Sequence, residues 1–240
     1  MYSTSDLTNW TTLNALGSVK EIIYGNKYVA LLANSVIYIS TDGVTFTNAS
    51  SNLSTIISNA GGRNNMCYYN NKYFTCGYKV TSCTAYSSDG ITWTASNLTG
   101  EGLMDSIIYT GSIFICSGMG FLYKSVDGIS WTKDATVSFS NNGYQSTACS
   151  NGSNILSVGS NGYYSINNGT SWTDLSTVSM PLTTMMLCTY NAYMNKWFCF
   201  NFGGTNYYYS SNLTTWTLSN TCNQTGSFIA VIPKFIGCPN

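Results

Sequence analysis

The sequence of 240 residues contains no histidine, a single arginine (Arg63), three prolines and few charges. Charged residues make up 8% of the chain, whereas about a quarter of an average soluble protein is charged. Without histidine, the chain cannot build a Ser-His-Asp triad, a Cys-His nucleophile pair or a Cys2His2 zinc site. We therefore predict no bound metal and no cofactor.

Clusters of basic residues are also absent, since nine Lys and Arg are balanced by nine Asp and Glu. Nucleic acid and anionic membrane surfaces require such clusters, so we predict no nucleic-acid partner. The sequence contains no run of about 18 apolar residues, so we predict no membrane-spanning segment. The N-terminal sequence MYSTSDLTNW lacks the basic and apolar regions of a Sec signal. We expect a location on a virion or outside the cell without a Sec signal, or alternatively in the cytoplasm.

Hydrophobic residues make up 44% of the sequence, which is enough for a sizeable core, and large aromatic residues recur at a regular distance. The spacings between successive anchors are 36, 47, 38, 41 and 44 residues, and the anchors are Trp10, Phe46, Trp93, Trp131, Trp172 and Trp216. A period of about 40 residues is the size of one four-stranded propeller blade.

Short apolar segments separated by Gly and Asn turns divide each repeat into four expected strands, A to D. The chain begins in a C strand at Tyr2 and ends in an A and B pair between Phe228 and Cys238. We therefore predict an all-β, single-domain, six-bladed propeller over residues 1–240, whose last blade combines the N-terminal C and D strands with the C-terminal A and B strands. The expected blades are residues 18–48, 65–95, 104–133, 146–174, 185–218, and 226–240 with 1–13. Closure of this kind removes exposed sheet edges.

A recurring motif precedes each aromatic anchor. Ser165, Asn167, Gly169 and Trp172 have the spacing Ser-x-Asn-x-Gly-x-x-Trp. Three further copies are one residue shorter, at Ser40 to Phe46, Ser87 to Trp93 and Ser125 to Trp131, and two have Leu7 and Leu213 in place of glycine. The motif resembles the Asp-box, or BNR, repeat of sialidase-like propellers, which implies the same fold.

The acid or amide of each motif is predicted to be structural. Ser and Asp side chains accept backbone N–H bonds of their own turn, glycine permits positive φ, and the aromatic ring anchors the turn. The resemblance also places these motifs opposite the family's active site. The residues concerned are Asp6, Asp42, Asp89, Asp127, Asn167 and Asn212. Adventitious metal binding is the alternative for the acids.

The sialidase activity itself does not carry over to this sequence. That family binds the substrate carboxylate with three arginines, and this chain contains only Arg63. A different glycoside hydrolase needs two carboxylates about 5 to 10 Å apart. Glu21 and Asp105 occupy equivalent positions at the start of A strands, with Glu101 nearby. We favour the interpretation that these acids are solvated, with a hydrolase or lyase as the alternative.

The loops between strands D and A and between B and C are expected to form the ligand face. They contain the candidate contact residues Arg63, Tyr78, Lys79, Tyr144 and Phe202. Tyr, Asn, Ser and Thr with few charges suit a neutral glycan or a protein partner. We predict a non-enzymatic binding or structural module, on a viral or phage particle or as an attachment protein, with an intracellular scaffold as a further alternative.

The nine cysteines follow the predicted strands rather than a metal or redox spacing. One position accepts Cys, Ile, Leu or Val, which is typical of a small buried hydrophobe. Cross-strand disulfides are conceivable for Cys67 with Cys76 and for Cys188 with Cys199. Reduced thiols in the core are the favoured interpretation, while Cys83 and Cys222 fit neither arrangement.

Overall fold

The computed structural model describes residues 2–3, 11–12, 16–58, 66–98, 102–118, 120–139, 146–159, 161–178, 180, 185–201 and 207–219. Within these ranges the chain forms β-strands and three short 3-10 helices, with no α-helix. No helix of the described part is both long and apolar enough to span a bilayer.

Five antiparallel four-stranded sheets, which we call blades 1 to 5, contain most of the strands. Blade 1 comprises β3 (Val19–Tyr24), β4 (Tyr28–Leu32), β5 (Ile37–Ser40) and β6 (Thr47–Asn48). Blade 2 comprises β8 (Met66–Tyr69), β9 (Lys72–Cys76), β11 (Thr84–Ser87) and β12 (Thr94–Ala95). Blade 3 comprises β13 (Met104–Tyr109), β14 (Phe114–Gly118), β15 (Phe121–Ser125) and β16 (Thr132–Lys133). Blade 4 comprises β17 (Thr147–Ser150), β18 (Ile155–Val158), β19 (Gly162–Ser165) and β20 (Thr173–Asp174). Blade 5 comprises β21 (Met185–Asn191), β22 (Lys196–Asn201), β23 (Tyr207–Ser210) and β24 (Thr217–Ser219).

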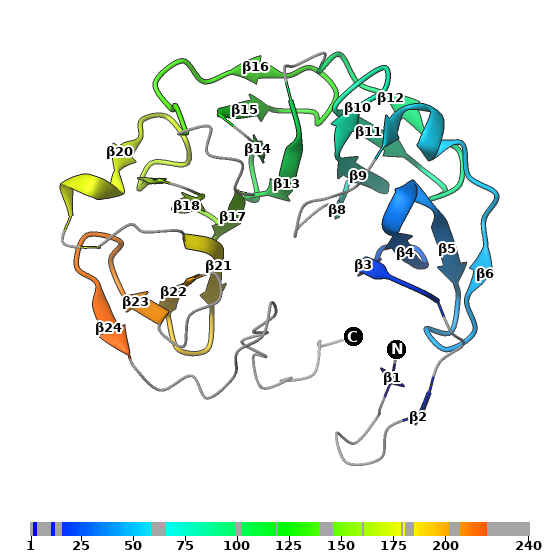
Figure 1. Cartoon of the computed structure of the whole chain (residues 1–240), viewed down its shortest axis with the longest axis horizontal. Helices are drawn as coiled ribbons and strands as arrows, with labels where there is room; N and C mark the ends of the chain where they lie inside the picture. The colour runs from blue at the N-terminus through cyan, green and yellow to red at the C-terminus, as the bar shows by residue number, and fades with distance from the viewer. Residues whose placement is uncertain are drawn as a thin grey trace.

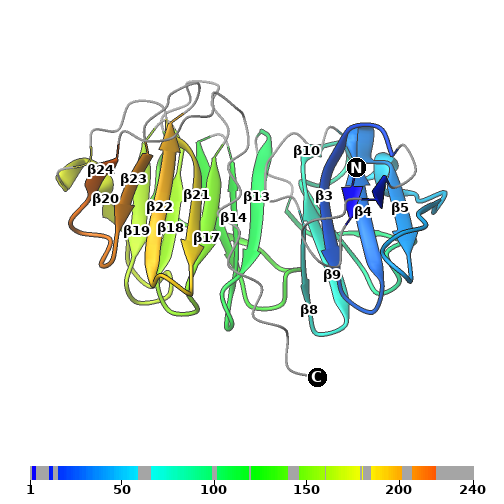
Figure 2. The same cartoon turned by 90° about the horizontal axis from the view of Figure 1, so that it is seen from below.

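The blades follow one another around a common centre (Figure 1). In each blade the first strand, A, is innermost and the fourth, D, is outermost (Figure 1). Because neighbouring strands are antiparallel, all A–B and C–D turns lie at one end of the molecule, the lower end in Figure 2. The B–C and D–A connections leave the opposite end of each sheet.

Two short two-stranded sheets and three 3-10 helices accompany the blades. Strand β1 (Tyr2–Ser3) pairs with β2 (Thr11–Thr12), and β7 (Ile57–Ser58) pairs with β10 (Tyr78–Lys79). The helices are η1 (Ala33–Ser35), η2 (Leu53–Thr55) and η3 (Leu175–Thr177). The prediction of four-stranded antiparallel blades is confirmed for five of them. The sixth blade and its closure stay a prediction, because residues 220–240 and most of residues 1–15 lie outside the described part.

The core lies between neighbouring blades. Buried side chains of blade 1, including Val29 and Leu31, pack against Tyr73 and Trp93 of blade 2 in one cluster. Blades 2 and 3, 3 and 4, and 4 and 5 share similar clusters. The second strand of blades 1 to 4 is therefore buried on both sheet faces, which explains the high apolar content of a chain with so few charges.

Candidate functional site

The C–D turns of all five blades are held by the same hydrogen bonds. In blade 1, the Ser40 hydroxyl donates to Asp42 Oδ1 (2.7 Å) and accepts from the Gly43 N–H (2.9 Å). Asp42 Oδ1 also accepts from the N–H groups of Val44 and Thr45, each at 2.8 Å. The equivalent Ser and Asp or Asn residues of the other blades also bond within their own turns, at Ser87 and Asp89, Ser125 and Asp127, Ser165 and Asn167, and Ser210 and Asn212. These acceptor oxygens are therefore occupied by the backbone of their turns.

The same bonds explain the acidity of the turn carboxylates. Hydrogen bonds from Thr45, Val44 and Ser40 hold the pKa of Asp42 well below its usual range. Partial burial raises the pKa of Asp89 and Asp127, but the bonds from their turns outweigh it and leave both pKa values lowered. The sixth residue of this set, Asp6, lies outside the described residues.

The position after the acid requires a positive φ. Gly43, Gly90 and Gly128 all have φ of 71°, and Leu213 adopts φ of 68° in the same place. A leucine in this left-handed region is strained. Its side chain is fully buried among the core residues of blades 4 and 5, which offsets the strain.

The structure describes only part of the predicted ligand face. Tyr78 is 51% exposed, and its backbone pairs with Ser58 and bridges to Leu103. Lys79 lies beside it on β10, although its side chain is outside the description. Arg63, Glu101, Tyr144 and Phe202 also lie outside the described residues.

Two of the acids considered for catalysis connect neighbouring inner strands. Glu21 Oε2 accepts the Met66 N–H of blade 2 at 2.6 Å. Asp105 Oδ2 accepts the Ser146 N–H, which leads into blade 4, at 3.2 Å. Asp105 has no exposed surface, and this burial raises its pKa to about 7 against the opposing effect of the Ser146 bond. A substrate cannot contact the Asp105 carboxylate while blades 3 and 4 stay packed.

The seven described cysteines are free thiols. Cys188 and Cys199 lie directly opposite each other in β21 and β22. The prediction that Cys67 faces Cys76 is wrong, because β8 and β9 pair Cys67 with Phe74. The cause is a tight two-residue turn formed by two asparagines at positive φ, Asn70 and Asn71.

Burial raises the pKa of the Cys76 and Cys199 thiols and keeps them protonated. Within the described ranges, no three or more Cys, Asp or Glu side chains are grouped to hold a metal ion. Cys222 and Cys238 lie outside those ranges.

Six tyrosine rings lie in three contacting pairs at the A–B turn end of blades 1 to 3. Tyr24 contacts Tyr28, with ring centroids 4.6 Å apart, in blade 1. Tyr69 of blade 2 stacks on Tyr109 of blade 3 at 3.7 Å. Tyr68 and Tyr73 lie between these pairs, at 4.7 Å from each other. We call these six residues the aromatic strip.

The strip crosses from blade to blade through close packing and hydroxyl bonds. A Cβ at Gly25 would lie 2.3 Å from the Tyr68 ring, so only glycine permits this approach. Tyr73 Oη accepts the Lys27 N–H at 3.1 Å, while Asn26 Oδ1 and Lys27 O lie 2.7 and 2.8 Å away as acceptors for its own proton. A hydrogen bond with Tyr69 raises the pKa of Tyr109 to about 12.

Several large side chains at this end are open to solvent. Tyr24 is 63% exposed and Tyr69 is 40% exposed, and the A–B turn of blade 5 adds Tyr193 at 68%. Exposed Met194 lies next to Tyr193, and the C–D turns contribute exposed Val44, Val126 and Ile166. This surface lies at the end opposite to the loops for which ligand contact is predicted from the sequence. The available signal was the recurrence of tyrosine directly before the A–B turn, at Tyr24, Tyr69 and Tyr109.

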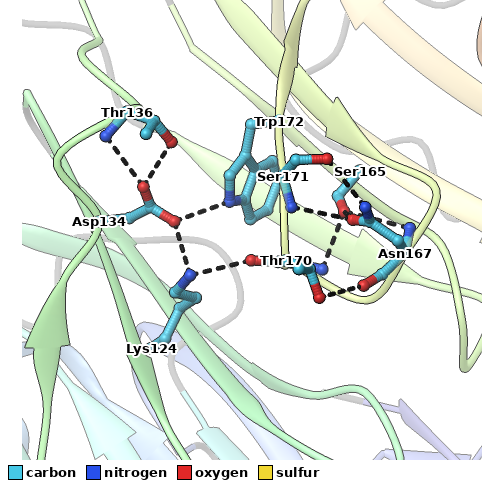
Figure 3. Close-up of polar contacts among 9 residues, drawn as sticks. Lys124, Asp134, Thr136, Ser165, Asn167, Thr170, Ser171 and Trp172 are labelled. Carbon is cyan, nitrogen blue, oxygen red and sulfur yellow. Dashed lines mark hydrogen bonds and ion pairs between the residues drawn. The ribbon is translucent and has the colours of Figure 1, made fainter.

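The outer contacts between blades are of two kinds. Between blades 1 and 2, Asn52 Oδ1 accepts the Trp93 N–H at 2.8 Å and Asn52 Nδ2 donates to Trp93 O at 3.0 Å. Between blades 3 and 4, Asp134 Oδ2 accepts from the Trp172 indole N–H and from Lys124 Nζ, each at 2.9 Å (Figure 3). Lys124 also donates to the carbonyl oxygen of Gly169 at 2.9 Å.

No protein-family model matches the sequence, and a search of curated proteins finds no match. Solved structures do match. A streptogramin B lyase superposes with a TM-score of 0.67 at 10% identity, over 93% of this chain and 76% of the lyase. The protein YCF48 bound to a D1 peptide matches with a TM-score of 0.59 at 14% identity, over 88% of this chain and 71% of that chain. The GH74 xyloglucanase from Xanthomonas campestris matches with a TM-score of 0.63 at 12% identity, over 90% of this chain and 41% of the enzyme. These neighbours are β-propellers of varied function, and together with the five four-stranded sheets they show that the chain has the β-propeller fold.

Proposed function

We propose that this propeller is a binding module that contacts a protein partner through the aromatic strip and other exposed residues at the same end of the molecule. The observation that carries the proposal is the exposure of Tyr24, Tyr69, Tyr193 and Met194 at one end of the molecule. Tyrosine and methionine are enriched in protein interfaces, and tyrosine contributes a large rigid area at low entropic cost. Exposed aliphatic side chains beside the rings favour a protein surface over a sugar.

The solved neighbours are consistent with this class of function. One of them, YCF48, is described as bound to a D1 peptide. The state of the inner acids supports binding over hydrolysis, since Asp105 is fully buried and both Glu21 and Asp105 accept backbone bonds from the next blade. A further proposal is that the chain belongs to the Asp-box propellers. The sequence motif in the C–D turns supports it, since Ser40 donates to Asp42 and Asp42 accepts the Val44 N–H.

Site-specific photocrosslinking tests the contact surface. A benzophenone amino acid is placed at Tyr24 in one variant and at Tyr78 in the other, since Tyr78 is similarly exposed at the opposite end. Mass spectrometry identifies the partner protein captured by the crosslinker. The partner is then purified, and its affinity is measured for wild type, Tyr24→Ala and Tyr78→Ala. We expect crosslinks from position 24 and weaker binding by Tyr24→Ala alone. Crosslinks and affinity loss only at position 78 would place the contact on the ligand face predicted from the sequence.

Two finer proposals concern ligand chemistry and location. A neutral glycan is the second candidate partner, supported by the uncharged polar composition. A glycan array with a parallel hydrolysis screen tests it, and turnover lost in Glu21→Gln would instead establish a hydrolase or lyase. The same composition supports a place on a virion or phage particle or outside the cell. Detection of the chain only in cytoplasm, and never in purified particles, would refute that location.

A further inference from the structure

The C–D turn of blade 4 departs from the repeat by one residue. Ser165 and Trp172 are seven positions apart, whereas Ser125 and Trp131 are six apart. The additional residue is Asn168, which adopts φ of 54°. Its side-chain Nδ2 donates to the Ser112 hydroxyl in the A–B turn of blade 3. The longer turn therefore reaches across to the preceding blade.

The indole of the anchor tryptophan changes partner at this turn. In the shorter turn of blade 3, Trp131 Nε1 donates to its own turn at Gly128 O, at 3.1 Å. In blade 4, Trp172 Nε1 instead donates to Asp134 of the preceding blade, at 2.9 Å. Lys124 bridges the same Asp134 and the Gly169 carbonyl (Figure 3). The contact between blades 3 and 4 is therefore made by different groups from those of the shorter turns.

A pocket of about 600 Å³ occupies this contact. Typical small-molecule sites have about 300 to 1,000 Å³. A second pocket, beside the C–D turn of blade 1, is smaller at about 280 Å³. The larger pocket is lined by Ile113, Lys124, Thr132, Asn168 and neighbouring residues of both blades.

The polar groups of the pocket favour a neutral ligand with several hydroxyl groups. Lys124 offers an ammonium donor whose charge is matched by the buried Asp134 behind it. Asn168 also lines the pocket, and its amide is bonded to the Ser112 hydroxyl, which fixes its place in the wall. Exposed Thr132 adds a hydroxyl. An anion gains little here, because Asp134 already compensates the lysine.

Apolar atoms complete the wall of the pocket. Ile113, in the A–B turn of blade 3 just before β14, and Val126, in the C–D turn of the same blade, both line the pocket. A sugar ring combines C–H faces with hydroxyl groups that donate and accept, which fits a wall of this composition. We propose that the pocket between blades 3 and 4 binds a hexose, either free or at the end of a glycan.

Calorimetric titration and saturation-transfer NMR with glucose, galactose, mannose and N-acetylglucosamine test the proposal on the full chain. We expect at least one sugar to bind in the millimolar range, and Thr132→Val to weaken its binding by about tenfold through loss of one hydrogen bond. Thr94→Val is the matched control, because Thr94 takes the equivalent place on β12 beside Tyr86 as Thr132 does on β16 beside Lys124. Both threonines are exposed, so neither change disturbs the core.

Deletion of Asn168 gives a second, independent test, because it shortens the turn to the length found in blade 3. Circular dichroism and thermal unfolding establish that the deletion variant is folded. We expect it to lose sugar binding, while Tyr24→Ala keeps it, which separates this site from the protein-contact surface. Wild-type sugar affinity in both Thr132→Val and the folded deletion variant would overturn the proposal. So would the absence of binding by all four sugars, or displacement of the sugar by acetate or phosphate.

Discussion

Two contacts between blades solve the same structural problem with different chemistry. Blades 1 and 2 are joined on the outside by the neutral Asn52, which bonds the backbone of Trp93. Blades 3 and 4 are joined by the charged pair Lys124 and Asp134, and on the inside by the buried Asp105. The inner bond between blades 1 and 2 comes from Glu21, which is only partly buried. Charge is therefore concentrated where the repeat is irregular.

This difference shows how a repeat protein acquires an individual site. A regular contact, such as that of Asn52, bonds the backbone of the next blade. In blade 4, which has the additional residue Asn168, the Trp172 indole bonds to Asp134 instead, and a pocket of about 600 Å³ lies at this contact. In a chain with 8% charged residues, the ion pair between Lys124 and Asp134 is a specific feature of this contact rather than a general means of solubility.

The largest expected effect on the irregular contact comes from Asp134→Ala. Asp134 accepts bonds from Lys124, Trp172 and Thr136, and its side chain is 5% exposed. Its removal leaves these donors without their acceptor, and we expect a loss of about 2 to 3 kcal/mol in unfolding free energy. Urea denaturation measures it. Asp174→Ala is the control, because Asp174 only caps η3 through Ser176 N–H, and equal losses for the two variants would contradict the assignment.

The inner side of the same contact predicts a dependence of stability on pH. The pKa of Asp105 is about 7 in the folded chain, above the unfolded value of 3.8. The stabilising protonated form is thus fully present below pH 3.8, and its contribution is lost as the pH rises toward 7 and above. We expect stability to fall by about 2 kcal/mol between about pH 5 and pH 8.

Asp105→Asn isolates this effect, because an amide keeps a similar shape and an acceptor for Ser146 N–H but does not titrate in this range. Thermal unfolding at several pH values measures both proteins. We expect a much flatter profile for the variant. If stability falls with pH as steeply in Asp105→Asn as in wild type, the pH dependence comes from another group.

The regular contact is expected to respond less strongly. Asn52→Ala removes two neutral bonds to Trp93, and we expect a loss of about 1 kcal/mol. Asn97 makes a single side-chain bond, to the Trp131 N–H, so Asn97→Ala should cost less than Asn52→Ala. Denaturant midpoints of the two variants provide the comparison. A loss for Asn52→Ala as large as that of Asp134→Ala would remove the distinction between the two contacts.

The smallest effect concerns the turns themselves. Asn167 and Asn212 replace the acid naturally and bond their turns through Oδ1 as Asp127 does. We therefore expect Asp127→Asn to change stability at pH 7 by less than about 0.5 kcal/mol. Asp127→Ala, which removes the acceptor, should cost more. Calorimetric melting temperatures of the two variants distinguish them, and equal losses would show that the turn does not depend on this oxygen.

Much of the fold was predictable because its signals are local. The spacing of Phe46, Trp93, Trp131, Trp172 and Trp216 marks the outer end of each described blade, and each aromatic residue packs in a core cluster. The register of individual hairpins was less predictable. Cys67 pairs with Phe74 because two asparagines adopt positive φ, a choice that a nine-residue spacing between cysteines does not reveal.

The candidate site was harder to predict from the sequence than the fold. Tyr69 and Tyr109 are 40 positions apart and stack only because neighbouring blades bring the ends of β8 and β13 together. The same tyrosines fit the β propensity of their strands, so their exposure could not be inferred from the pattern. Tyr24 ends an A strand and Tyr78 follows a B strand, so the antiparallel strand directions place them at opposite ends of the molecule.

By itself, the sequence determined the repeat of four strands, the turn chemistry of Ser40 and Asp42 and the scarcity of charge, because each depends on residues close together in the chain. The tertiary structure decided which side chains of different blades meet. Lys124 reaches Gly169, and Asp105 reaches Ser146, across more than a full repeat. Contacts of this kind depend on the distance and angle between packed sheets, which local patterns do not specify.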